Sequence, residues 1–341
     1  MQLGRIEVKY RKLLVTKPWV VEVCEDEIDL NDIPADNIAI KTRYTLISTG
    51  TELACLSGKE SWFKLPDTPG YISVGEIVAK GRGVNNVKIR DIIFHYGQHS
   101  EYIIMPKDNF FIKVPDGLDE RHALFGRITS IAMTALRVSD IELGDYVAVT
   151  GLGLVGNMAG QLAKLQGGNV IGIDIIHKRL EISHKCGIEF CINSNGKVKD
   201  KIMEITQSQG VSTLIEATGS SKVIIESLPL IAKGGEIILL GSPREEYQCN
   251  ITDVLNYCHL SPRGCITFKG AHEWRYPIKH DNFVKHSIER NTRIIFDLMK
   301  KGRLLVKPLI THVVKPDEAA SAYEGLRDKK DEYIGVVIDW K

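Results

Sequence analysis

The stretch Tyr146-Val147-Ala148-Val149-Thr150-Gly151-Leu152-Gly153-Leu154-Val155-Gly156 decides the fold. An apolar, β-rich run leads directly into the spacing G-x-G-x-x-G, and a helical pattern from Asn157 to Leu165 follows it. A second apolar run begins at Asn169 and ends at Asp174. Strand, glycine turn, helix and strand in this order predict the dinucleotide-binding unit of an α/β, doubly wound parallel sheet.

Each glycine of the motif has a mechanical role. Gly151 permits the tight turn, Gly153 lets the backbone approach a pyrophosphate, and Gly156 lets helix and strand pack closely. Leu154 and Val155 open the helix, where backbone amides bind phosphate oxygens. The motif therefore predicts a nicotinamide dinucleotide as the ligand.

Asp174 indicates which dinucleotide is bound. It follows Gly156 by 18 residues, close to the spacing of about 20 for a carboxylate that accepts hydrogen bonds from the adenosine ribose. We expect Ile175, the next residue, to contact the cofactor as well. Because a carboxylate repels a 2′-phosphate, the sequence favours NAD over NADP. The alternative is an ordinary α/β domain with a glycine-rich turn and an acidic strand end.

Length and charge narrow the class of protein. A chain of 341 residues exceeds the size of a single core, about 250 to 300 residues, which predicts two domains. The 44 basic and 43 acidic residues nearly cancel, so no basic stripe for nucleic acid is expected. No apolar run reaches the roughly 18 residues of a membrane span, and residues 1–12 lack a signal-peptide core. We expect a cytoplasmic protein.

Three blocks follow one another along the chain. Residues 1 to about 120 contain short β-rich segments, expected at 38–41, 73–79, 91–94, 101–105 and 110–114. From Ile141 to about Phe268, strands near Val147, Val170, Thr213, Glu236 and Ile266 alternate with helices. An amphipathic helix through 296–299 and a final strand, 334–338, are too little to fold alone. The tail should therefore rejoin the first block.

The chain resembles the medium-chain dehydrogenases/reductases of the alcohol and polyol dehydrogenase type. Besides the dinucleotide unit, the matching phrases are Ile47-Ser48-Thr49-Gly50-Thr51-Glu52-Leu53, Pro69-Gly70-Tyr71-Ile72-Ser73-Val74-Gly75-Glu76, Gly97-Gln98-His99-Ser100-Glu101-Tyr102, Glu216-Ala217-Thr218-Gly219 and Lys269-Gly270-Ala271. The resemblance implies a GroES-like catalytic domain at 1–128, a Rossmann domain at 129–272, and a segment at 273–341 that completes the catalytic domain. It also implies a homodimer or homotetramer formed through the Rossmann domain.

The zinc ligands of that family are replaced. The cysteine phrase reads Thr49-Gly50-Thr51-Glu52, the G-H-E phrase reads Gly70-Tyr71-Ile72, and the third ligand position falls on Arg127. Zinc prefers sulfur, imidazole or carboxylate ligands, and arginine keeps its proton. The four-cysteine lobe is missing too, and the seven cysteines form no C-x-x-C pair. We therefore expect no metal site.

Arg127 and Tyr71 are candidates to replace the zinc. The guanidinium of Arg127 could donate hydrogen bonds to the developing alkoxide, and its alternative role is a salt bridge to Glu52 or Glu76. Tyr71 could donate to the carbonyl oxygen or act as a base. A buried tyrosine with a satisfied hydroxyl is the alternative for Tyr71.

Thr51 and His99 complete the catalytic candidates. Thr51 matches the hydroxyl that relays the alcohol proton in zinc-dependent relatives, and a turn-stabilising hydroxyl is its alternative. His99 resembles a histidine phrase of zinc-free relatives and could be the general base, because imidazole titrates near neutrality. A structural histidine at a strand edge is the alternative.

Further cofactor contacts follow from the resemblance. Arg179 falls where relatives place a basic residue on the adenosine ribose. Strand ends that face the cofactor supply Thr218, Gly241 and Ser242, and Ala271 and Glu273 match backbone positions that hold the carboxamide.

The resemblance is strongest to sugar, glycoside and cyclitol dehydrogenases. It implies reversible, NAD-dependent oxidation of a secondary hydroxyl on a small polyhydroxylated substrate. A zinc-free quinone or enone reductase is a second possibility, although such enzymes usually prefer NADPH, which Asp174 disfavours. A non-catalytic NAD(H)-binding protein is the third, because every zinc ligand is absent. Fold alone does not choose among these functions.

Overall fold

The computed structural model describes residues 7–341, and its contacts divide the chain into two units. Residues up to Arg127 join Ile310–Lys341 in the first unit, and Ile128–Leu309 form the second. Residues 1–6 lie outside the described residues. They belong to the expected first domain and to the stretch 1–12, for which we expect no signal-peptide core. Within residues 7–341, no helix is both long and apolar enough to span a bilayer.

The second unit is the predicted doubly wound domain. Its six parallel strands have the order β10-β9-β8-β11-β12-β13, and the sequence switches from strand to helix after most of them. The strands are β8 Tyr146–Thr150, β9 Asn169–Asp174, β10 Phe190–Asn193, β11 Val211–Glu216, β12 Ile231–Leu239 and β13 Thr267–Gly270. The helices are α4 Leu154–Gln166, α5 His177–Lys185, α6 Val198–Ile205, α7 Ser221–Ser227, α8 Ile251–His259 and α9 Ile288–Lys300.

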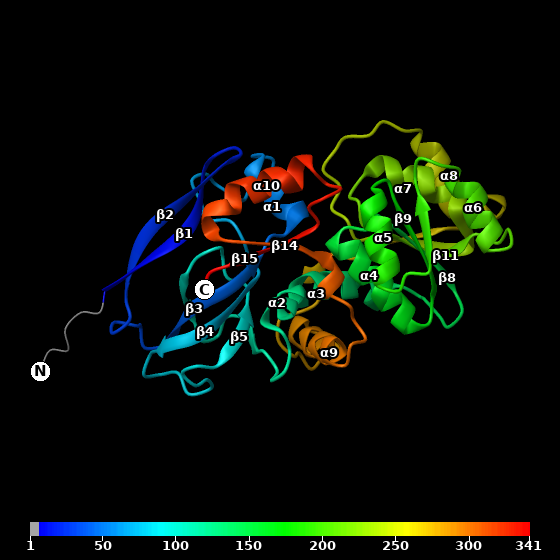
Figure 1. Ribbon diagram of the computed structural model, residues 1–341. Helices are drawn as coiled ribbons and strands as arrows, with labels where there is room; N and C mark the ends of the chain where they lie inside the picture. The colour runs from blue at the N-terminus through cyan, green and yellow to red at the C-terminus, as the bar shows by residue number, and fades with distance from the viewer. Residues whose placement is uncertain (1–6) are drawn as a thin grey trace, which may run out of the picture. The chain divides into compact units, whose positions relative to one another are not determined.

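The core of this unit lies between the sheet and its helices. Helix α4 packs on β8 and β9, and α5 packs on β9 and β10 (Figure 1). The strands present apolar side chains to these helices, as expected for a parallel sheet covered on both faces. Ala148, Ile171, Leu214 and Ile237 are fully buried there. The sheet thereby holds its carboxyl-terminal edge, where the glycine motif lies, in a fixed arrangement.

The first unit is β-rich, as the sequence predicts. A seven-stranded sheet has the order β14-β15-β3-β4-β5-β7, with β6 paired to β3, and a separate pair contains β1 and β2. The strands are β1 Glu7–Lys17, β2 Val20–Asp29, β3 Asn37–Leu46, β4 Ser73–Lys80, β5 Ile92–His95, β6 Tyr102–Pro106, β7 Phe111–Lys113, β14 Ile310–Val314 and β15 Gly335–Asp339. The helices are α1 Thr49–Leu56, α2 Glu120–Ala123 and α10 Ala319–Asp328, and α3 Phe125–Val138 crosses the boundary between units.

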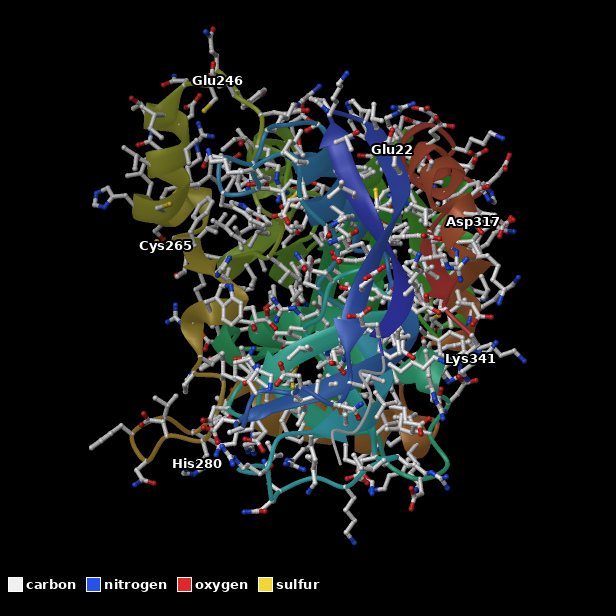
Figure 2. All side chains as sticks on the ribbon, turned by 90° about the vertical axis from the view of Figure 1, so that its left-hand side faces the viewer. Glu22, Glu246, Cys265, His280, Asp317 and Lys341 are labelled. Carbon is white, nitrogen blue, oxygen red and sulfur yellow. The ribbon has the colours of Figure 1, made fainter. Side chains whose placement is uncertain are left out.

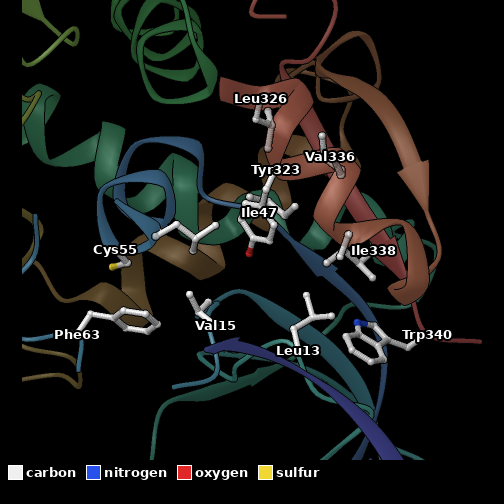
Figure 3. Close-up of a cluster of buried hydrophobic side chains, with 13 residues drawn as sticks. Leu13, Val15, Ile47, Cys55, Phe63, Tyr323, Leu326, Val336, Ile338 and Trp340 are labelled. Atoms are coloured by element: carbon white, nitrogen blue, oxygen red, sulfur yellow. The ribbon is translucent and has the colours of Figure 1, made fainter. Parts of the chain in front are cut away.

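The C-terminal tail rejoins the first unit, as expected. Strand β15 pairs with β3, and α10 buries Tyr323 and Leu326 against Ile47 and Val15 in one apolar cluster (Figure 3). Figure 3 shows the ring of Tyr323 inside this cluster. Chain ends far apart in sequence therefore share a core.

The expected boundary at residue 273 is wrong, because residues 273–309 belong to the second unit. The side chain of Gln161 on α4 explains part of this placement. Its amide donates to the carbonyl of Leu305 and accepts from the Leu305 amide, at 3.0 and 2.7 Å. Both hydrogen bonds tie the segment after α9 to helix α4 of the second unit.

The structure contains a hairpin, β1 and β2, that none of the expected strands covers. Its strands twist about each other (Figure 2), and Lys17 pairs with Val20 across a two-residue turn. Trp19 occupies that turn with φ of 64°, a conformation that usually selects glycine or asparagine. The turn therefore lacks the residues by which a hairpin is recognised in a sequence.

Candidate active site

The glycine motif has the geometry that a pyrophosphate requires. Gly151 adopts φ of +83°, and a Cβ on Gly156 would lie 1.8 Å from the carbonyl oxygen of Gly151. Around Gly153, the N-cap of α4, no atom lies within 4 Å of an added Cβ. The turn is thus closed beneath the helix and open at its amino end, where Leu154 and Val155 present their amides. These residues fit a dinucleotide phosphate.

Asp174 lies at the end of β9 beside this turn. Its carboxylate accepts hydrogen bonds from the amides of Leu152 and Ile176, at 2.7 and 2.8 Å. Arg179 approaches the same carboxylate, with Nη1 3.6 Å from Oδ2, and Ile175 is exposed next to it. Each carboxylate oxygen keeps a second lone pair for a ribose hydroxyl. The structure thus adds a role that the sequence did not reveal, because Asp174 also fixes the glycine turn.

The remaining cofactor candidates lie at the same edge of the sheet. Buried Glu216 ends β11 and accepts from the amides of Thr218 and Gly219, at 2.7 and 3.1 Å. The amide of Gly241 donates to the Glu216 carbonyl at 2.7 Å, Ser242 follows it, and burial raises the pKa of the Glu216 carboxyl. The amide of Ala271 donates to Leu239 at 3.0 Å. Glu216 therefore shapes the loop that carries Thr218.

Three of the four catalytic candidates come together in the first unit. Thr51 lies in the first turn of α1, Tyr71 precedes β4, and Arg127 lies at the start of α3. The Tyr71 hydroxyl bonds to the hydroxyl of Ser48 and also interacts with Thr51. The guanidinium carbon of Arg127 lies 5.3 Å from the centre of the Tyr71 ring and 4.1 Å from that of Tyr96. A cation thus stacks on the tyrosine that replaces a zinc ligand.

Burial sets the ionisation state of Tyr71. Removal from water is the main cause that raises the pKa of its hydroxyl above the ordinary value, and the nearby Ser48, Thr51 and Arg127 only reduce this effect. The hydroxyl therefore carries its proton at neutral pH. Tyr71 is suited to donate a hydrogen bond and poorly suited to act as a base.

The fourth candidate, His99, lies in a buried network. Its Nε2 is 2.9 Å from Oε2 of Glu52, and the Tyr323 hydroxyl donates to the same oxygen at 2.5 Å. The other oxygen of Glu52 accepts from the Ser48 amide at 2.7 Å. His99 is fully buried and Glu52 is 2% exposed. His99 thus holds the carboxylate that positions Ser48, which in turn bonds to Tyr71.

The carboxylates expected as partners of Arg127 have other contacts. Glu76 pairs with Arg43 at 2.8 Å, and Glu52 binds His99 and Tyr323 as described. Sequence reasoning missed Ser48 and Tyr323. Ser48 lies inside the recognised phrase Ile47–Leu53, a cue that was available, but nothing near Tyr323 indicated a contact with a residue 271 positions away.

These side chains do not fit a catalytic zinc. The three ligand phrases contribute hydroxyl groups, the Glu52 carboxylate, which is already held by His99 and Tyr323, and the guanidinium of Arg127, which repels a metal cation. Across residues 7–341, no cluster of three or more histidine, cysteine, aspartate or glutamate side chains is arranged to hold a metal ion.

A glycine-turn dinucleotide site in one unit and a polar cluster in a β-rich unit define a two-domain oxidoreductase. Residues 155–280 match the family model described as zinc-binding dehydrogenase. D-guloside 3-dehydrogenase of Shigella flexneri is 30% identical over 67% of this chain and 72% of its own length. L-threonine 3-dehydrogenase of Vibrio parahaemolyticus is 25% identical over 98% of this chain and 100% of its own length.

A solved structure has the same fold as this chain. Galactitol-1-phosphate dehydrogenase from Escherichia coli superposes with a TM-score of 0.81 at 16% identity, covering 96% of this chain and 99% of that one. The chain belongs to the medium-chain, zinc-binding dehydrogenase superfamily and is an NAD(P)-dependent dehydrogenase. The predicted fold class is confirmed.

Proposed function

We propose that this chain is a zinc-independent, NAD-dependent dehydrogenase that reversibly oxidises a secondary hydroxyl of a sugar, glycoside or cyclitol to a ketone. The contact of Arg127 with Tyr71, where the superfamily places zinc ligands, carries the proposal. The likeness to D-guloside 3-dehydrogenase supports the substrate class. NAD, when bound, supplies the hydride acceptor.

Arg127 and Tyr71 would stabilise the oxygen of the reacting carbon. Both are hydrogen-bond donors, since guanidinium remains charged and the raised pKa of Tyr71 keeps its hydroxyl protonated. Preorganised donors of this kind stabilise the charge that develops on an alkoxide. They perform the electrostatic part of zinc catalysis without a metal.

A chain of hydroxyl groups would move the alcohol proton. The Tyr71 hydroxyl contacts those of Ser48 and Thr51, so each oxygen can accept a proton while it passes its own to the next, and half-buried Thr51 releases one proton to solvent water, the final acceptor. Glu52 holds the Ser48 backbone in place through a hydrogen bond of 2.7 Å. In this scheme His99 and Tyr323 position Glu52, and His99 is no longer the general base.

The carboxylate of Asp174 supports NAD rather than NADP. It is fixed by two backbone amides and cannot turn away from a 2′-phosphate without breaking them. The neighbouring Arg179 is drawn toward Asp174 at 3.6 Å, which reduces the positive charge that would attract such a phosphate. Discrimination against NADP is therefore expected from charge repulsion.

A substrate panel tests this proposal. Purified protein is incubated with NAD or with NADP and with methyl glycosides, free sugars, inositols and simple alcohols, and the absorbance of the reduced cofactor is recorded. We expect turnover on a polyhydroxylated substrate with NAD and a much lower rate with NADP. Turnover only on quinones or enones with NADPH would identify a reductase, and NAD binding without any turnover would identify a non-catalytic protein; either contradicts the proposal.

We also propose that the second unit forms the contact between copies of the chain. Strand β13 is an edge of the six-stranded sheet, and α8 exposes Ile251 and Leu255, which are 60% and 57% exposed. Exposed edge strands pair readily with a second copy. Light scattering should give a dimer or tetramer, and Leu255→Asp should shift it toward the monomer. A monomeric wild-type protein would contradict this.

A further inference from the structure

A group of basic side chains lies in the second unit, outside the candidate active site. We call Arg137, His286 and Arg290 the basic cluster. Arg137 lies in the last turn of α3, Arg290 in the first turn of α9, and His286 directly before the N-cap of α9. Figure 1 shows α9 next to α3. Nη1 of Arg290 is 3.2 Å from Nδ1 of His286.

No acidic side chain that the structure describes neutralises this cluster. Besides burial, the groups that act on the pKa of Arg137 are Arg290, which lowers it, and Tyr276, which raises it. Burial lowers the pKa of His286, and Arg137, Arg290 and Lys285 lower it further. The nearest acid on α9, Glu289, pairs with Arg293 at 2.7 Å.

Arg137 also keeps an unused donor. Among residues 7–341, the hydrogen-bond acceptor of its Nη2 is the sulfur of Met133, at 3.5 Å, a weak acceptor. Its Nε is buried and has no hydrogen-bond partner among the described residues. A partly buried guanidinium without a carboxylate is costly unless an anion binds it. The cluster therefore has the charge and the donors of an anion site.

Side chains, rather than the helix terminus, would hold the anion. The amides of Ile288 and Glu289 donate to the carbonyls of Pro277 and Ile278, each at 2.9 Å. The amide of Arg290 donates to the Ser287 hydroxyl at 3.1 Å. These first amides of α9 are already used, so guanidinium and imidazole groups remain as donors.

We propose that Arg137, His286 and Arg290 bind a phosphate group. Two guanidinium groups offer paired donors that match phosphate oxygens. Tyr276 packs edge-on against the His286 ring, with centroids 5.5 Å apart, and fixes its orientation. The phosphate could be free inorganic phosphate or the phosphomonoester of a sugar phosphate.

Isothermal titration calorimetry with sodium phosphate tests this site. The full chain is titrated at constant ionic strength with NAD present in excess, so that the glycine turn is filled. We expect saturable binding at one site, weakened at least about tenfold by Arg137→Gln and by Arg290→Gln, since each removes a charged donor. Arg293→Gln, on the same helix but paired with Glu289, is the matched control and should bind as the wild type does.

Two further measurements distinguish free phosphate from a phosphate ester and test the part played by His286. A sugar monophosphate that binds no more tightly than inorganic phosphate identifies free phosphate as the ligand, whereas tighter binding of the ester identifies a phosphomonoester. Phosphate should also raise the pKa of His286 in an NMR titration of the wild type. Absence of saturable binding, or equal weakening by Arg293→Gln, would overturn the proposal. Because Arg290 is exposed, its variant decides the matter if Arg137→Gln does not fold.

Discussion

The dinucleotide turn and the Arg127–Tyr71 cluster are built in opposite ways. The turn uses one continuous stretch, from Tyr146 to Asp174, in which backbone groups make most of the contacts. The cluster collects side chains from distant segments, and its supporting Tyr323 lies 271 residues from Glu52. A local site tolerates few backbone changes, whereas a dispersed site depends on individual side-chain groups. Substitutions should therefore affect cofactor binding and catalysis separately.

The largest effect is expected at the local site. A side chain on Gly156 collides with the Gly151 carbonyl, 1.8 Å from the added Cβ, so Gly156→Val should abolish NAD binding measured by calorimetry. Gly160→Ala on the same helix is the control, because the closest atom to its Cβ would be the terminal methyl of Ile188 at 2.7 Å, with Val170 in ordinary contact at 3.5 Å. NAD binding that survives Gly156→Val would show that the turn is not the cofactor site.

The next effect is expected at the dispersed site. Arg127→Gln removes the cation over Tyr71 and should lower kcat by about 100- to 1,000-fold, the usual loss for an oxyanion donor, while NAD affinity stays unchanged. Tyr71→Phe should lower kcat in the same direction. Arg121→Gln serves as the control, because the Arg121 side chain pairs with Asp119 and is 43% exposed. An unchanged kcat in Arg127→Gln would leave the cluster without a catalytic role.

A smaller effect should follow loss of the buried support. Tyr323→Phe removes the hydroxyl that donates to Glu52 and should lower the free energy of unfolding by about 1.5 to 3 kcal/mol, the usual range for a hydrogen bond to a charged group. Chemical denaturation measures this change. Tyr333→Phe, whose ring stacks on His312, should be nearly neutral, and equal losses in both variants would argue against a special role for Glu52.

The effect that is smallest at neutral pH, because it develops only on acidification, concerns His95, a buried imidazole of the first unit whose ring nitrogens have no hydrogen-bond partner within residues 7–341. Burial lowers its pKa to about 3. The unfolded chain binds the proton near pH 6.5, about the ordinary value, so the stabilisation is complete above that pH and is lost as pH falls toward 3. The loss should be about 1.4 kcal/mol per pH unit.

Denaturation at decreasing pH checks this sign. The slope of the unfolding free energy against pH gives the number of protons taken up on unfolding. His95→Phe should lower that number by one between pH 6.5 and 3, whereas His122→Phe, on α2, should leave the contribution of His95 in place. An unchanged pH dependence in His95→Phe would contradict the prediction.

The same contrast explains what the sequence could predict. The glycine spacing and Asp174 predict the turn because their geometry is local. The strands of the second unit are predicted by short apolar runs that alternate along the chain with helical segments. Strand β10, Phe190–Asn193, gives a weaker apolar signal than its neighbours because it is short and only partly buried. Thr51 was found as a match to a hydroxyl position of the family, and Tyr71 and Arg127 as replacements of its zinc ligands. Their contacts through Ser48, Glu52 and Tyr323 depend on tertiary packing, which no sequence spacing encodes.

Turnover without metal tests the central claim most directly. Chelator-treated protein, shown to be free of zinc by elemental analysis, is assayed with NAD and a polyhydroxylated substrate before and after zinc is added. The account predicts the same kcat in both conditions, because Arg127 and Tyr71 supply the donors that zinc supplies elsewhere. Activity that appears only after zinc is added would contradict it.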